Sequence, residues 1–294
     1  MSRAGSTVEK SPEVRWRKLG STREKSTEVR RYDEVPVMAR LRRVILILAF
    51  AAGCGGSDAT PPAGSGSPGP SPGPSVAPLR VLVLTATAGF RHGSIETARQ
   101  TLSSLAARTG EFTVTATEDL SQITAARLQT VDVLMFLLTS GELAFDDSQK
   151  AAIIGFVQNG GGFIGAHSAT DTLYGWPDYG RLVGAYFKEH PWVQDATVLV
   201  EDRDHPSTRA LGASFRLNEE YYTFRDNPRP NVHVLLSLDA VSVGTTGDYP
   251  LAWSQSVGQG RSFYTALGHF DATWLDARFQ EHMRGAIKWV GKRE

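Results

Sequence analysis

Short apolar runs recur along the chain from Leu79 onward and predict the strands of an α/β domain. Runs that are apolar almost throughout are typical of strands buried on both faces of a parallel sheet. Three strands of this kind are predicted in the first half of the domain, at 79–85, 131–137 and 163–166. A fourth strand, at 112–116, instead alternates between polar and apolar residues.

Amphipathic stretches between these strands predict helices. Residues 94–109 form one, with Ser94 at the N-cap and Gly110 as the stop. Another begins at the acidic segment 146–149 and ends at Gly160, with apolar residues at helical spacing between them. The repeated alternation of strand and helix predicts an α/β fold whose parallel sheet is covered by helices on both faces.

The second half of the domain has a different pattern, in which additional strands dominate. They are predicted at 196–200, 232–236, 251–254 and 261–265. The segment Gly258-Gln259-Gly260 is typical of a hairpin turn and joins the last two. Residues 277–290 predict a closing helix whose apolar stripe faces the core.

Composition narrows the classes of function. The chain has 294 residues with 31 Lys+Arg and 31 Asp+Glu, so its formal net charge is zero. The domain has no basic run interleaved with aromatic residues, so we expect no nucleic-acid partner. The single cysteine, Cys54, precedes the domain. This excludes a disulfide within the monomer, and it excludes cysteine-ligated zinc and a cysteine nucleophile in the domain.

The residues before the domain predict a leader and a tether. Residues 1–37 are charged and lack apolar periodicity, which indicates either disorder or a start codon assigned too early. Residues 38–54 combine a basic segment, an apolar segment of nine residues and the tetrapeptide Ala51-Ala52-Gly53-Cys54. Residues 55–78 are almost all Pro, Gly, Ser and Ala, which is typical of a semi-extended linker. The folded domain is therefore expected at 79–294.

The tetrapeptide that ends at Cys54 resembles the lipobox of bacterial lipoproteins, in which the cysteine is lipidated after cleavage. It departs from that pattern at Ala51, where Leu is usual, and the alternative is an ordinary signal peptide with an incidental cysteine. The cysteine falls at the expected place and the linker follows at once. We therefore expect an exported lipoprotein of the cell envelope, anchored to the membrane by a lipid on Cys54.

The segment from Gly160 to Asp171 carries the strongest chemical signal. A helix ends in a glycine cluster, a short strand follows, and a polar turn opens with His167. Ligands of open α/β sheets bind beyond the carboxyl ends of strands. Gly165 and Ala169 flank His167 where a nucleophile elbow requires small residues. We expect His167 to act as a general base or a metal ligand rather than as a nucleophile.

Two further histidines follow predicted strands in the same way. His92 comes after strand 79–85 and precedes a helix N-terminus, and His269 comes after strand 261–265. Taken alone, His92 is equally consistent with a loop residue that caps its own turn. Three histidines at strand ends favour one shared polar site.

Other polar residues extend the candidate set. Asp171 either orients a side chain, binds a sugar hydroxyl or begins a helix. His190 and Trp192 lie in a predicted loop, where the indole either stacks on a sugar or packs beneath the loop. Glu219 and Glu220 would point to opposite faces of a strand, so one of them faces the site.

The remaining histidines are assigned structural positions. His205 belongs to a charged turn, and His233 is a core or edge residue of an apolar strand. His282 is expected to be solvated on the last helix.

Six ordered segments of 79–294 together resemble the ThuA-like, or trehalose-utilisation, family: 87–92, 160–171, 190–192, 202–206, 218–222 and 266–269. That family is similar in fold to class I glutamine amidotransferases, so the resemblance implies a flavodoxin-like parallel sheet with a catalytic elbow. The amidotransferase elbow holds a cysteine, whereas His167 occupies that region here, so glutaminase chemistry is not available. The family is associated with bacterial use of sugars such as disaccharides or their keto derivatives.

The resemblance and the motif positions assign roles to individual residues. Catalytic roles fall to His167, His92, Glu220 and Asp171. Substrate-binding roles fall to Arg91, His190, Trp192, Glu219 and His269. His92, His167 and His269 are candidate ligands of a divalent metal such as zinc, although the chain has no compact H-x-H or H-x-x-x-H pair among them.

Two functions are open at this point. The first is a hydrolase or lyase that acts on a small carbohydrate, either a glycoside or a keto-sugar. The second is a non-catalytic carbohydrate-binding or scaffolding lipoprotein. Several imidazoles in one site favour the enzyme, because sugar binding alone rarely needs them, whereas the missing nucleophile favours the binding protein. We prefer the enzyme.

Overall fold

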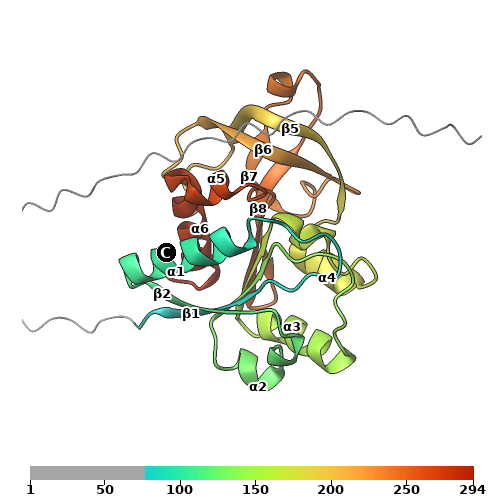
Figure 1. Ribbon diagram of the computed structural model, residues 1–294, viewed down its shortest axis with the longest axis vertical. Helices are drawn as coiled ribbons and strands as arrows, with labels where there is room; N and C mark the ends of the chain where they lie inside the picture. The colour runs from blue at the N-terminus through green and yellow to red at the C-terminus, as the bar shows by residue number, and fades with distance from the viewer. Residues whose placement is uncertain (1–76) are drawn as a thin grey trace, which may run out of the picture. The chain divides into compact units, whose positions relative to one another are not determined.

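One sheet of nine strands runs through residues 77–294, the part of the chain that the computed structural model describes (Figure 1). The predictions for 1–37 and 38–54, and for the linker up to residue 76, lie outside the described residues. Within 77–294, no helix is both long enough and apolar enough to cross a membrane.

The first five strands in the sheet order are parallel, as the alternation of strands and helices predicts. In order across the sheet they are β2 (Phe112–Thr117), β1 (Leu79–Leu84), β3 (Val133–Leu137), β4 (Gly162–Ala166) and β9 (Gly260–Thr265). Every residue of β3 and β4 is buried, because helices cover both faces of the sheet here.

The additional strands of the second half extend this same sheet in antiparallel fashion. From β9 outward they are β8 (Pro250–Val257), β7 (His233–Leu238), β5 (Phe187–Val200) and β6 (Ser214–Phe224). The predicted hairpin is confirmed, since Val257 pairs with Gly260. The fold is therefore a mixed α/β sheet.

Three helices lie on each face of the sheet (Figure 1). One face carries α1 (Ile95–Thr109), α5 (Asp271–Leu275) and α6 (Ala277–Val290), and the other carries α2 (Ala125–Leu128), α3 (Asp147–Gln158) and α4 (Pro177–Val183). Three short 3₁₀ helices complete the described elements: η1 (Leu120–Gln122), η2 (His167–Asp171) and η3 (Ala240–Val243).

The predicted helix boundaries are confirmed to within two residues, since α3 ends at Gln158 rather than at Gly160, and one difference matters for the site. Gly110 ends α1 at φ 66°, and Asp146 begins α3 with a capping box that includes Gln149. Ser94 does occupy the N-cap position of α1, but its side chain makes no cap. Its hydroxyl instead donates to the carbonyl of Gly268, 3.1 Å away, and so ties α1 to the loop that carries His269.

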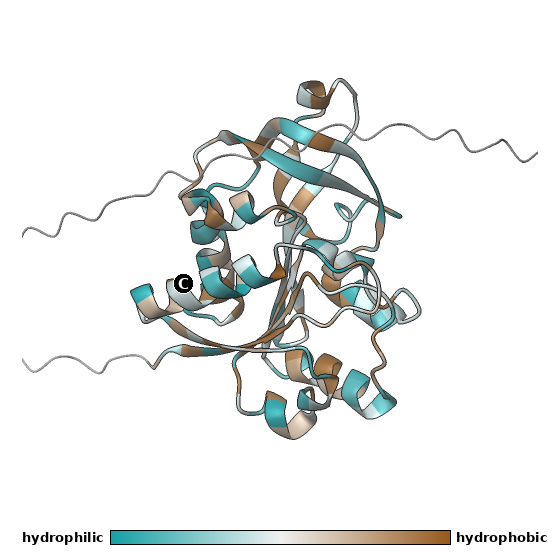
Figure 2. Ribbon diagram, in the orientation of Figure 1, coloured by the Kyte–Doolittle hydropathy of each residue, from teal (hydrophilic) through white to brown (hydrophobic). Residues whose placement is uncertain are grey.

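Two local predictions were wrong. His190 and Trp192 lie in β5 and not in a loop, because β5 begins at Phe187. Its first residues are largely exposed, and Figure 2 shows the β5–β6 ribbon as mostly hydrophilic, so no apolar alternation marked the strand. His282 is 1% exposed and not solvated, because its ring packs between Phe263 and Phe279.

Candidate functional site

The turn after β4 has the geometry of a strained elbow centred on His167. His167 has φ 50°, a left-handed conformation that is uncommon for residues other than glycine. A Cβ atom added at Gly165 would lie 3.0 Å from Val183 and 3.2 Å from the Cβ of Ala169. The small residues on either side of His167 therefore allow the close packing that the elbow pattern predicts.

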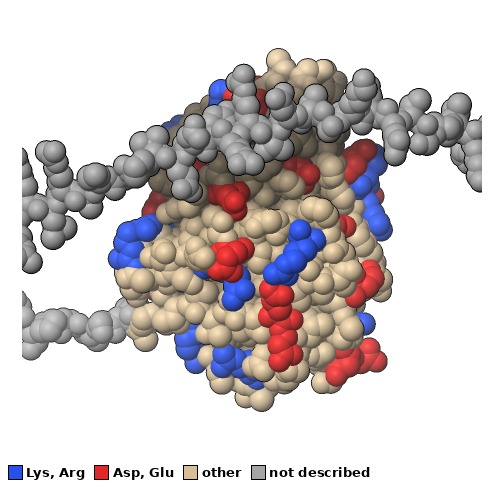
Figure 3. Space-filling view, viewed as in Figure 1, with Lys and Arg blue, Asp and Glu red and all other residues tan. Residues whose placement is uncertain are grey.

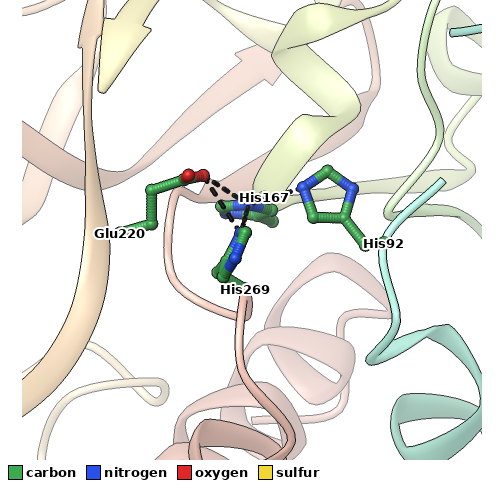
Figure 4. A group of neighbouring side chains, drawn as sticks. All are labelled: His92, His167, Glu220 and His269. Carbon is green, nitrogen blue, oxygen red and sulfur yellow. Dashed lines mark hydrogen bonds and ion pairs between the residues drawn. The ribbon is translucent and has the colours of Figure 1, made fainter. Parts of the chain in front are cut away.

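Four side chains from distant parts of the chain converge at this elbow (Figure 4). His92 comes from the loop after β1, His269 from the loop after β9, and Glu220 from β6. Their ligand atoms and that of His167 all lie within 4.8 Å of one another. We call His92, His167, Glu220 and His269 the histidine cluster.

The hydrogen bonds of His167 fix which of its nitrogens faces the cluster. Its Nδ1 lies 2.7 Å from the carbonyl of Ala266 and donates to it, so Nε2 of the neutral ring carries the lone pair. Around that Nε2 lie His92 Nε2 at 3.1 Å, His269 Nδ1 at 3.3 Å and Glu220 Oε2 at 3.4 Å. Three imidazoles and one carboxylate thus bring their ligand atoms together at one point, so the arrangement suits a cation placed among them.

The donor set also fits the size of a zinc site. Zinc held tetrahedrally by nitrogen and oxygen at about 2.0–2.1 Å separates its ligand atoms by about 3.3 Å. Four of the six separations in the cluster are close to this value, since the three distances to His167 Nε2 are 3.1, 3.3 and 3.4 Å and His269 Nδ1 lies 3.1 Å from Glu220 Oε2, and all six stay within 4.8 Å. Three imidazoles and one carboxylate are ligands that zinc accepts, so the residues present fit the metal expected from the sequence.

A second layer of contacts orients the cluster. The carboxylate of Glu219 is fully buried and accepts from the backbone N–H groups of Gly268 at 2.9 Å and of His269 at 3.1 Å. It also accepts from Thr273 Oγ1 at 2.7 Å. Glu219 therefore holds the loop of His269, while Glu220 on the opposite side of β6 faces the histidines, as strand alternation predicts.

The protonation of the cluster follows from burial and from its mutual charges. Burial, followed by the neighbouring His167 and His269, lowers the pKa of His92 to about 3, so this ring is neutral near pH 7. Burial by itself raises the pKa of Glu220, but interactions with His167 and His269 outweigh burial and hold this pKa well below its usual range. The contact with Glu220 raises the pKa of His269.

Other residues predicted for the site lie near the cluster or apart from it. His190 Nδ1 is 3.4 Å from Glu220 Oε1, and its side chain is half-exposed. Asp171 accepts a hydrogen bond from Tyr174 at 2.6 Å, and Arg91 forms an exposed ion pair with Glu118 at 2.7 Å. Trp192 packs edge-on against Tyr249. Asp171, Arg91 and Trp192 are thus outside the histidine cluster.

Sequence reasoning missed three residues beside the cluster. The hydroxyl of Tyr222 lies 3.0 Å from His167 Nε2, and Ser168 Oγ lies 3.3 Å from His92 Nδ1. Phe90 packs edge-on against His92 and is 66% exposed. Tyr222 could have been found from the sequence, because it lies two residues from Glu220 and so on the same face of a strand.

A cavity of about 860 Å³ lies away from the histidine cluster. Leu79, Val131 and Gly161 line it, so it sits at the amino ends of the parallel strands, opposite to the histidine cluster. Ligand sites of such sheets occur at the carboxyl ends, so volume alone does not identify the site here. On the face seen in Figure 3, acidic and basic side chains are mixed, with no large area of one sign.

The sheet and its elbow define the class of protein: a glutamine amidotransferase-like fold in which a histidine takes the elbow position. The family model described as trehalose utilisation, ThuA, matches residues 80–290, and the chain belongs to this family. No curated protein matches the sequence significantly.

Two solved structures are similar over most of their length. A ThuA-like protein from Bacteroides uniformis ATCC 8492 is 25% identical with a TM-score of 0.62, over 76% of this chain and 95% of that one. A ThuA-like protein from Parabacteroides merdae ATCC 43184 is 19% identical with a TM-score of 0.60, over 73% of this chain and 90% of that one. Both likenesses support the fold.

Proposed function

We propose that this protein is a metal-dependent enzyme of carbohydrate utilisation, a hydrolase or lyase acting on a glycoside or a keto-sugar. The observation that carries the proposal is the histidine cluster at the carboxyl end of the sheet, whose donor atoms have the number and type that zinc binds and lie within 4.8 Å of one another. The sugar class comes from the family, whose description is trehalose utilisation.

The chain's own residues would bind and move protons around this centre. A divalent ion, when bound there, supplies Lewis-acid polarisation of a substrate oxygen. Burial raises the pKa of Tyr222 well above its usual value, so its hydroxyl stays protonated and can donate a hydrogen bond to that oxygen. His190 is half-exposed and contacts Glu220, so it is placed to exchange a proton with the substrate.

The proposal extends to architecture and location. The five parallel strands have the order β2-β1-β3-β4-β9, which supports a flavodoxin-like arrangement in that half of the sheet. The pattern of residues 38–54 supports export and a lipid anchor on Cys54, which would place the enzyme in the cell envelope.

Elemental analysis of the chain purified without a histidine tag tests the proposal. We expect near-stoichiometric zinc or another divalent ion in the wild type, and its loss in His167→Ala and His269→Ala. His233→Ala is the matched control, because this exposed histidine pairs with Asp202 outside the cluster and its loss should leave the metal in place.

The same proteins would then be assayed for hydrolysis and elimination on a panel of glycosides and keto-sugars. Turnover that disappears with the metal supports the enzyme. A wild type without metal, or sugar binding with no product, would instead favour the non-catalytic carbohydrate-binding protein.

A further inference from the structure

A second cavity, of about 400 Å³, lies where β5 and β6 pair near the start of β5. This volume is at the lower end of the range of about 300–1,000 Å³ found for small-molecule sites. Its lining combines flat apolar rings with hydrogen-bonding groups: Trp192, Tyr249, Pro191, Pro250, Asn227 and Asp248. We call it the Trp192 cavity.

The aromatic rings of this cavity are held in fixed positions. Trp192 and Tyr249 pack edge to face, with ring centres 4.9 Å apart and planes at 79°. The hydroxyl of Tyr249 donates to the carbonyl of Thr246 at 3.0 Å, which fixes the far end of that ring. The C–H groups on one face of a pyranose pack well against such a flat apolar surface.

The polar groups of the cavity are oriented as firmly. Asp248 receives two hydrogen bonds from Arg229, at 2.6 and 2.7 Å, and one from the side-chain amide of Asn227 at 2.8 Å. A carboxylate offers about four acceptor positions, so one remains for a further donor. A sugar hydroxyl is a donor of that kind, so Asp248 can bind the rim of a ring stacked on Trp192.

Two residues that line this cavity, Tyr222 and Pro191, connect it to the histidine cluster. Tyr222 lines the cavity and its hydroxyl lies 3.0 Å from His167 Nε2. Pro191 lines the cavity too, and the preceding His190 lies 3.4 Å from Glu220. The pairing of β5 with β6 shifts register between Phe187 and Trp192, and such bulges re-aim side chains next to active sites.

We propose that the Trp192 cavity is a saccharide subsite, which binds a pyranose ring linked to the sugar that reacts at the histidine cluster. The substrate is then a glycoside with at least two rings. This inference rests on the proposed function, because it assumes that the reacting sugar binds at the histidine cluster.

The test follows the indole N–H signal of Trp192 by NMR in the full-length chain, with Trp192→Phe used to assign that signal. Trehalose, maltose and cellobiose are titrated, with glucose as the single ring. We expect the disaccharides to move the signal and Tyr249→Ala to weaken their binding about tenfold, which is the size expected for one aromatic contact. Trp289→Phe is the matched control, because this half-buried indole stacks on Arg261 and should leave binding unchanged.

The outcomes separate this inference from the proposed function. A Trp192 signal that none of the sugars moves overturns the inference, as does equal binding in Tyr249→Ala, even if metal and turnover are found. If the wild type lacks metal and turnover while the disaccharides still move the signal, the proposed function fails and the subsite stands by itself.

Discussion

Glu219 and Glu220 are neighbours on β6 with different environments. Glu219 is fully buried and accepts hydrogen bonds from the loop of His269, whereas Glu220 faces the imidazoles. We predict that Glu219→Gln weakens metal affinity about 10–100-fold, because an amide cannot accept from all the donors that now bind the carboxylate. Competition with a chelator measures the affinity, and Glu96→Gln, an exposed carboxylate on α1, is the control. Unchanged metal affinity would contradict a positioning role.

Tyr222 and Tyr221 provide a matched pair of phenols. The hydroxyl of Tyr222 points to His167, while that of Tyr221 donates to the carbonyl of Leu217 at 2.6 Å. We predict that Tyr222→Phe lowers kcat about 100-fold with unchanged metal content, because one donor to the reacting oxygen is lost. Tyr221→Phe should leave kcat unchanged. Equal rates in the two variants would remove Tyr222 from the mechanism.

The three histidines at strand ends could be predicted from the sequence, whereas the carboxylate that meets them, Glu220, could not be singled out by spacing alone. His92, His167 and His269 each follow a strand of a parallel sheet, and the carboxyl ends of parallel strands meet at one edge. Glu220 reaches the same point from β6, the outermost antiparallel strand, whose position depends on tertiary pairing. Spacing along the chain contains no information on that pairing, so strand alternation by itself could not show which of Glu219 and Glu220 faces the histidines.

At the scale of elements, the contact between β4 and the elbow leaves no room for a larger residue. A Cβ at Gly165 would already lie 3.0–3.2 Å from Val183, Ala169 and Tyr264. We predict that Gly165→Val lowers the free energy of unfolding by about 1–3 kcal/mol through overpacking. Gly93→Ala is the control, because a Cβ there meets nothing within 4 Å. Chemical denaturation that ranks the two variants equally would refute close packing at the elbow.

The last helix carries a buried titratable group. Burial lowers the pKa of His282 to about 4 from 6.5, so the unfolded chain binds more protons between these values. We predict that the free energy of unfolding falls as the pH drops from 6.5 to 4, by up to about 3 kcal/mol for this group. In His282→Gln the fall should be shallower. Met283→Ala on the same helix should lower stability equally at every pH, and an unchanged slope in His282→Gln would contradict the assignment.

Strands and helices of the buried half could be predicted from sequence, but the length of β5 could not. The parallel strands lie between two layers of helices and therefore read as apolar runs. The first residues of β5 pair with β6 alone, because β7 pairs only with Val198–Val200, and the side chains of this part of β5 are largely exposed. With no buried face there is no alternation to detect, and His190 and Trp192 resembled a loop.

At the scale of the whole molecule, the anchor can be tested apart from the fold. We predict that Cys54→Ser shifts the protein from the membrane fraction to the soluble fraction and abolishes incorporation of labelled palmitate, because the proposed lipid would be attached to this thiol. Ala51→Leu, which restores the usual lipobox residue, should keep the protein at the membrane. Palmitate incorporation into Cys54→Ser would show that Cys54 is not the lipid site.

The carbonyl of Gly268 accepts from Ser94 at the start of α1 and from the indole of Trp274 in α5. His92 and His269 therefore stand on segments from the two ends of the domain that hold each other in place. A chain that ends before β9 lacks His269 and cannot bring its imidazole to that of His92. Such a truncated chain would therefore bind metal poorly. Under the proposed function, the rate of metal uptake during refolding would therefore report when the first and last parallel strands have both joined the sheet.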